Sequence, residues 1–202
     1  MKMQKHTIKA LAIAVGVTAA SGAAMADIFT ATATVNSAIT LAETTPLDFG
    51  TIVATSSSNT VASIGGTATL EVSVNGTIST AASTGTATAT VTSLIDGAPA
   101  ELTVSGAPSF VTINVAEGTL NAMSHSSGAP AIPDFTITEL QFDTSNSATA
   151  PDGTEGDATG VTDGTGAMTI IVGATIQVAN DGNGTTYTDG TYSGDYEVLV
   201  TY

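Results

Sequence analysis

Carboxylates are the chemistry-bearing side chains of this sequence, which has 18 Asp and Glu residues against three Lys. The Gly-rich stretch 144–166 holds several of them, and calcium prefers carboxylate, amide and carbonyl oxygens on a flexible loop. The candidate metal ligands in this stretch are Asp152, Glu155, Asp157 and Asp163. Their spacing does not follow the EF-hand pattern, and Asp-Gly is also a common hairpin turn pair, so a calcium loop and a set of turns both stay open.

His125 is the only histidine after residue 26, so a Ser-His-Asp triad would have to use it. It lies in a Ser- and Gly-rich turn without a nucleophile-elbow motif, and a single histidine cannot form a zinc site. A glycosidase needs only two carboxylates, but sugar subsites usually also carry aromatic platforms, and the chain has no Trp. We therefore expect no enzyme activity and no cofactor, apart from possible calcium.

The charge distribution excludes several classes of partner. The three basic residues are Lys2, Lys5 and Lys9, so the chain beyond residue 26 has no Lys or Arg and a formal charge of −18, all 18 acids lying there. Nucleic acids and anionic membrane surfaces need basic side chains, and we expect neither as a partner. Without Cys, disulfides and thiolate metal sites are impossible. Because the chain beyond residue 26 also has no Lys, it cannot form isopeptide cross-links. Any polymer must therefore be non-covalent.

The N-terminus has the order of a secretory signal peptide. The three lysines precede an apolar stretch at 10–20, which is too short to span a bilayer, and Ala24, Met25 and Ala26 fit a small-x-small cleavage site. We therefore predict a signal peptide at 1–26, a mature chain that begins at Asp27, and no membrane insertion.

Beyond the signal peptide the composition predicts an all-β protein. Thr and Val favour strands, and clusters of Gly, Asp and Asn mark frequent turns. No amphipathic helix is evident, and ten short strands separated by turns indicate a sandwich or barrel. The expected strands are 29–35, 38–42, 47–54, 67–75, 86–94, 100–105, 110–115, 135–142, 167–178 and 191–202. We expect one domain over 27–202, with 144–166 as a long acidic loop.

The last expected strand shows the clearest alternation of apolar and polar residues. A period of two is typical of a strand that buries one face and exposes the other. Leu199 is the apolar exception on the outward face. The residues predicted for the inner face are Tyr192, Tyr196, Val198, Val200 and Tyr202.

Two segments carry a resemblance to known proteins. They are Leu-Asp-Phe-Gly-Thr-Ile at 47–52 and the closing Gly-x-Tyr-x-Gly-x-Tyr-x-Val-x-Val-x-Tyr at 190–202. Both resemble a family of exported bacterial domains of unknown function, and they are similar to the ends of spore-coat-U-type subunits assembled by archaic chaperone–usher systems. Those pilins often have a disulfide near the first strand, which this chain lacks.

The resemblance implies an immunoglobulin-like β-sandwich, pilin-like in lacking one edge strand. In such pilins a periplasmic chaperone, and then the N-terminal segment of the next subunit, supplies the missing strand. Residues 27–36 could act as this donor strand, because apolar side chains alternate with threonines there; the alternative is an ordinary strand within its own domain. The candidate donor residues are Phe29, Ala31, Ala33 and Val35.

The sequence thus favours a structural subunit of an exported fibre, such as a pilus, fimbrium or matrix filament. Its expected partners are copies of itself or related subunits, a periplasmic chaperone and an outer-membrane usher, and its expected location is the cell surface or extracellular matrix, reached through the periplasm. The alternative is a self-contained secreted binding domain, an adhesin or lectin, that uses the 144–166 loop with calcium.

Overall fold

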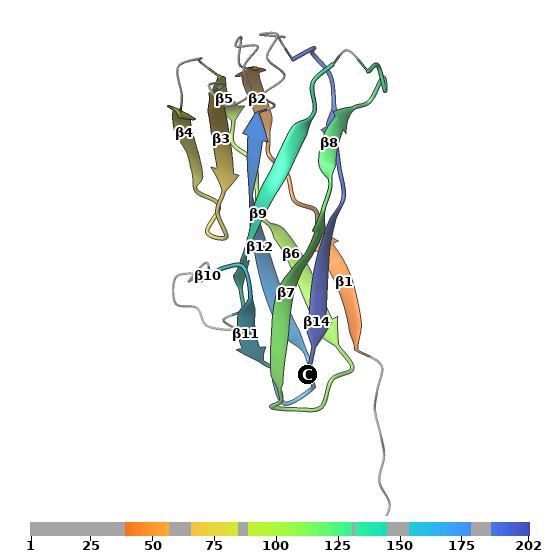
Figure 1. Cartoon of the computed structure of the whole chain (residues 1–202). Helices are drawn as coiled ribbons and strands as arrows, with labels where there is room; N and C mark the ends of the chain where they lie inside the picture. Colours follow the sequence, from red (N-terminus) through yellow and green to blue (C-terminus); the bar gives the residue numbers. More distant parts are fainter. Residues whose placement is uncertain (1–38, 57–65, 85–88, 131, 145–153, 179–186) are drawn as a thin grey trace, which may run out of the picture. The chain divides into compact units, whose positions relative to one another are not determined.

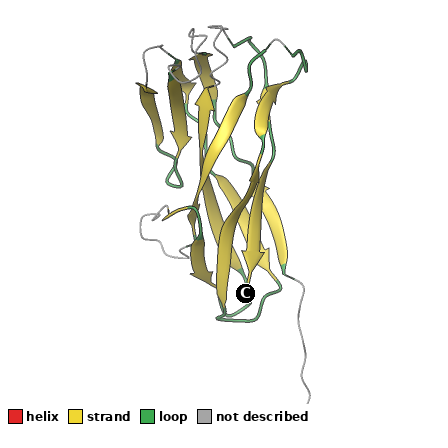
Figure 2. Cartoon of the chain, viewed as in Figure 1, coloured by secondary structure: helices red, strands yellow, loops and turns green. Residues whose placement is uncertain are grey.

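The computed structural model describes residues 39–56, 66–84, 89–130, 132–144, 154–178 and 187–202. The chain divides into two compact units, Met1–Thr34 and Val35–Tyr202, and every described residue lies in the second. The predicted signal peptide and donor strand therefore lie outside the described residues. Figure 2 shows strands and loops only, which confirms the all-β prediction for the described part of the chain.

In the described part of the chain all strand pairs are antiparallel, and the strands form sheets of nine, three and two strands (Figure 1). The largest sheet has the order β1-β6-β12-β9-β8-β13, with β10 beside β9 and the β3–β4 pair beside β12. Its strands are β1 (Thr40–Thr45), β3 (Thr67–Val72), β4 (Ile78–Thr84), β6 (Ala100–Ser105), β8 (Ala122–His125), β9 (Phe135–Asp143), β10 (Thr154–Glu155), β12 (Met168–Val178) and β13 (Tyr192–Ser193). The other two sheets contain β11 (Ala158–Val161), β7 (Thr112–Leu120) and β14 (Tyr196–Thr201), and β2 (Thr51–Thr55) with β5 (Thr90–Ile95).

The central strand of the nine-stranded sheet is β12, with 11 residues. It pairs with β9 along one edge, and on the other edge with β6 through Met168–Val172 and with β3 through Ala174–Gln177. Gly173 lies between these two partners, and a Cβ atom there would come within 2.6 Å of the Val72 carbonyl oxygen. A residue without a side chain therefore allows β3 to end against the backbone of β12.

The buried side chains of all three sheets form one apolar core. Ile113 and Val115 of the three-stranded sheet and Ala54 and Val91 of the two-stranded sheet join it with the inner residues of the large sheet. Sheets that share a core between their inner faces form a β-sandwich, as the sequence predicted. The bulkiest fully buried residues are Phe142, Leu70, Ile113, Leu140, Met168, Ile170 and Ile176.

The last predicted strand is divided between two sheets, which corrects the prediction of one continuous strand. β13 pairs with β8 in the large sheet, whereas β14 pairs with β7 in the three-stranded sheet. The crossing occurs at Gly194, where a Cβ atom would come within 2.6 Å of the Ala122 carbonyl oxygen, and the Asn121 N–H donates to the Asp195 carbonyl oxygen at 3.1 Å. Paired segments thus change sheets together, β7 into β8 and β13 into β14.

The segment 144–166, predicted as one long loop, contains two short strands in its described part. β10 adds to β9 and β11 adds to β7, so the segment contributes to two sheets. β4 and β8 were also not predicted, because their Ser- and Ala-containing sequences lack a clear apolar alternation. Among the described residues, none belongs to a helix with the length and apolar character that a bilayer span requires.

Candidate functional site

The first strand of the described chain has an inner face that the rest of the described part covers only in part. Leu41 and Glu43 of β1 lie opposite Val104 and Leu102 of β6, which are buried. Residues directly opposite in an antiparallel pair share a face, so Leu41 and Glu43 point to the interior of the sandwich. All six residues of β1 are nevertheless exposed.

Three edge strands meet along this opening. In the described part of the chain β1 pairs only with β6, β14 only with β7, and β2 only with β5. No described strand occupies their other edges, and such edges present backbone groups that can pair with an added strand. We call the space between the first strands, β1 and β2, and the last segment, residues 187–198, the edge groove.

The part of the edge groove between β1 and β14 is an open hollow of about 460 Å³. Its apolar lining comes from both sheets, and the β14 residues Tyr196 and Val198 are half-buried rather than buried. Val200 is also half-buried, whereas Leu199 faces outward at 46% exposure, as the sequence predicted. Tyr202, predicted for the inner face, is 51% exposed, because it lies beyond the end of β14.

The second part of the edge groove, along β2, encloses about 610 Å³ and shares Leu47 with the first. An aromatic cluster forms its far wall: Phe135 stacks on Tyr187 at a centroid distance of 4.2 Å, and Tyr192 meets Phe135 edge-on at 5.0 Å. The Tyr187 and Tyr192 hydroxyls donate to the carbonyl oxygens of Asp134 and Thr188. The two parts together give a groove that follows residues 41–55 on one side and 187–198 on the other.

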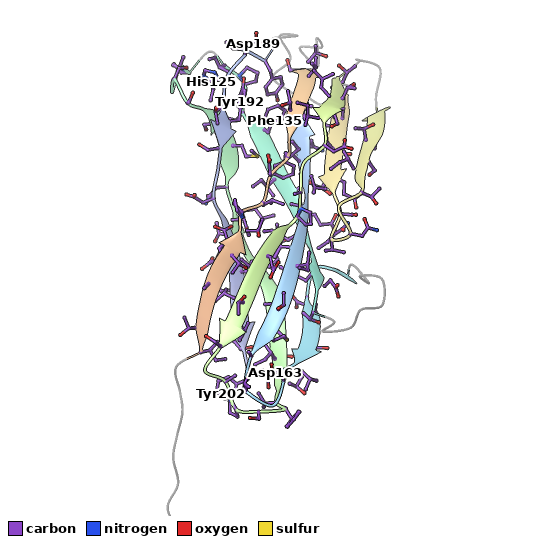
Figure 3. All side chains as sticks on the ribbon, turned by 180° about the vertical axis from the view of Figure 1, so that it is seen from behind. His125, Phe135, Asp163, Asp189, Tyr192 and Tyr202 are labelled. Carbon is purple, nitrogen blue, oxygen red and sulfur yellow. The ribbon has the colours of Figure 1, made fainter. Side chains whose placement is uncertain are left out.

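His125 helps to hold the wall of the edge groove. Figure 3 shows it at the same end as Asp189, Tyr192 and Phe135. The Ser127 backbone N–H donates to Nδ1 at 3.1 Å, so Nε2 carries the proton and donates to the Asp189 carbonyl oxygen at 3.3 Å. The ring also packs edge-on against Tyr192 at 5.1 Å. Through these contacts His125 holds the 187–192 segment against β8.

One hydrogen bond spans the opening from β14 to β1. The Tyr196 hydroxyl donates to the Glu43 carboxylate at 3.2 Å. Burial, and then the nearby Glu43 carboxylate, raises the pKa of Tyr196 far above its ordinary value. The hydroxyl therefore keeps its proton throughout the physiological pH range and remains a donor to Glu43.

The predicted calcium ligands are only partly placed. Asp152 and the side chain of Glu155 lie outside the described part, and Asp157 is exposed between β10 and β11. Asp163 organises its own turn: the Thr165 hydroxyl and the N–H groups of Thr165 and Ala167 donate to its Oδ1, which lowers the pKa of Asp163. Among the described residues, no three His, Cys, Asp or Glu side chains form a group that could hold a metal.

The unbalanced negative charge should make stability depend on salt. The chain beyond residue 26 has 18 acids and no Lys or Arg, and like charges repel more strongly in the compact state. We expect the melting temperature, followed by circular dichroism, to rise from low salt to about 0.5 M NaCl, where the Debye length is only a few Å. An unchanged or falling melting temperature would contradict this expectation. A response to calcium much larger than the response to magnesium would indicate a specific site in residues 152–163.

Comparison with protein families gives one result. The model described as "Domain of unknown function (DUF4402)" matches residues 39–202. The chain belongs to this family. Neither the curated proteins nor the solved structures contain a match to it. The DUF4402 domain includes both walls of the edge groove, whereas residues 27–36 precede it. The similarity to spore-coat-U-type and chaperone–usher subunits stays a prediction.

Proposed function

We propose that this DUF4402 protein is a structural subunit of an exported surface fibre, such as a pilus or matrix filament, and that subunits join non-covalently by β-strand addition. The observation that carries the proposal is the partly covered inner face of β1 beside the edge of β14 that no described strand occupies. A sandwich with such an opening gains backbone hydrogen bonds and apolar contacts when an extended segment enters it.

The occupant we propose is the segment 27–36 of another copy. Its alternating apolar side chains, Phe29, Ala31, Ala33 and Val35, suit a groove whose lining is apolar along one face. Its length of ten residues matches the ten residues from Tyr192 to Thr201, which span the last two strands, β13 and β14. Thr30, Thr32 and Thr34 would then face outward, where polar side chains belong.

The direction of the donor decides whether a fibre can form. In Figure 1, β1 begins at the end of the domain where β14 ends. A donor antiparallel to β14 enters at that end and leaves at the opposite end, so the domain that follows it joins head to tail. Head-to-tail contacts that do not close give open filaments. Antiparallel pairing also matches all the ladders found in the described residues.

Alternation restricts the register of the donor on β14. Inward residues must face inward residues, so the odd-numbered donor positions lie opposite Tyr196, Val198 and Val200. In the two registers that best overlap the ten residues, the residue opposite Tyr196 is either Ala31 or Ala33. A small donor side chain thus meets the largest inner side chain of β14.

Export is part of the same proposal. The predicted signal peptide would deliver the chain to the periplasm, where a chaperone could fill the edge groove until an usher exchanges it for the next donor. The open groove is a reason to expect such a chaperone, because exposed apolar faces and strand edges promote aggregation.

The proposal is tested by placing a charge on each face of the donor. Ala33→Asp should abolish fibres in negative-stain micrographs, because it brings an unpaired carboxylate into an apolar groove that already contains Glu43. Thr34→Asp is the matched control: it adds the same charge on the outward face and should leave fibres. Equal effects of the two changes would argue against strand addition, and a protein that never forms fibres would favour a self-contained binding domain.

A further inference from the structure

Glu43 is a charged residue in a position where an apolar one would be expected. It lies on the inner face of β1, directly opposite the buried Leu102, and it lines the edge groove between Leu41 and Tyr196. An inward-pointing charge on an edge strand is a known means of preventing unwanted strand pairing. The neighbouring inner residues Leu41, Leu102 and Val198, which line the same part of the groove, are all apolar.

Among the described residues, no basic side chain lines this part of the groove beside the Glu43 carboxylate. The titratable groups that line this part of the groove are Glu43 from β1, Asp195 from the turn before β14, and Tyr196 from β14. Glu101 lies on the opposite face of the sheet, since it alternates with the buried Ala100 and Leu102 on β6. Lys and Arg do not occur after Lys9. The Tyr196 hydroxyl is thus the protein donor that contacts Glu43.

We propose that Glu43 is the selectivity residue of the edge groove, which admits a donor strand only when that strand has a small side chain at this position, and which makes strand addition more favourable as the pH falls. This inference rests on the proposed strand addition. The small side chain leaves room for the Tyr196–Glu43 pair, and Ala31 and Ala33 satisfy this condition in both registers.

The pH dependence follows from desolvation. An added strand removes the Glu43 carboxylate from water, which costs free energy that the single Tyr196 hydroxyl offsets only in part. The charged form is therefore disfavoured in the filled groove relative to the open one, and strand addition takes up a proton. Assembly should become more favourable as pH falls toward the range in which carboxyl groups protonate.

The test uses the full exported chain and measures the rate of fibre growth by light scattering from about pH 5 to about pH 8. Glu43→Gln should grow about tenfold faster than the wild type at pH 7, which corresponds to about 1.4 kcal/mol, and its rate should change less with pH than the rate of the wild type does. Glu101→Gln is the matched control, because it removes the same charge from the outer face of the adjacent strand. It should behave like the wild type.

Two further variants keep the test decisive. Tyr196→Phe removes the hydroxyl but leaves the carboxylate, so its pH dependence should persist. Glu43→Thr places a good strand former at the site and should reproduce Glu43→Gln if the amide variant folds poorly. The inference is overturned if Glu43→Gln and Glu101→Gln behave alike. A wild type that shows no association at any pH overturns the proposed function itself, and this inference with it.

Discussion

Removing residues 27–35 should abolish fibres and leave a folded monomer. The family domain begins at residue 39, after this segment, and the core found among the described residues already joins inner residues from three sheets. If the segment occupies the edge groove of a neighbour, its loss removes an intermolecular contact and no intramolecular one. Analytical ultracentrifugation should show one monomeric species, and circular dichroism should keep the β spectrum.

A synthetic peptide of residues 27–38 provides the matching experiment for this truncated protein. It should bind the open groove and raise the melting temperature, since a ligand that binds only the folded state stabilises it. A peptide with Ala33→Asp should not. If the truncated protein is unfolded, the segment is an ordinary strand of its own domain and the self-contained domain becomes the better account.

Deleting residues 198–202 should prevent folding. The deletion removes four of the five β14 residues that pair with β7, namely Val198, Leu199, Val200 and Thr201. It also removes Val200, which lies directly opposite the fully buried Val115. Each buried aliphatic side chain is worth roughly 1.5–3 kcal/mol, against a net stability of about 5–15 kcal/mol for a typical domain. We expect no accumulation of soluble protein.

Removal of Tyr202 alone is the control for this deletion. This residue lies beyond β14 and is half-exposed, so the ladder between β14 and β7 stays complete. The shortened protein should melt close to the wild type. Soluble, cooperatively folded protein after the five-residue deletion would show that β14 is dispensable for the core.

The fold class could be predicted because strand composition and turn spacing are local properties. Predicted strand 100–105 coincides with β6, and 135–142 and 167–178 agree with β9 and β12 to within one residue at either end. These strands are rich in Val, Ile, Leu and Phe at alternating or continuously buried positions. β4 and β8 were not predicted because their sequences lack a clear apolar alternation, although each pairs with a strand that adjoins it in the chain, β4 with β3 and β8 with β9.

The edge groove depends on which strands lack neighbours, and no local pattern encodes that. Alternation correctly placed Tyr196, Val198 and Val200 inward and Leu199 outward, but it did not reveal that they are only half covered. The crossing at Gly194 also could not be predicted, because Gly is equally common in ordinary turns. Glu43 was not predicted as a site residue, because its position opposite Leu102 is known only from the sheet register.

The most direct measurement of the central claim is disulfide trapping, because the native chain has no Cys. Val198→Cys protein is mixed with Phe29→Cys or Ala31→Cys protein, one for each favoured register, and oxidised under mild conditions. Directly opposite residues of antiparallel strands have Cβ atoms about 4.5–5.5 Å apart, close to the distance that a disulfide requires. The account predicts covalent dimers from one of these mixtures, and none when Thr30→Cys, on the outward face, replaces the donor variant. Equal trapping by Thr30→Cys, or a disulfide that forms only within one chain of the double variant, would contradict strand addition between subunits.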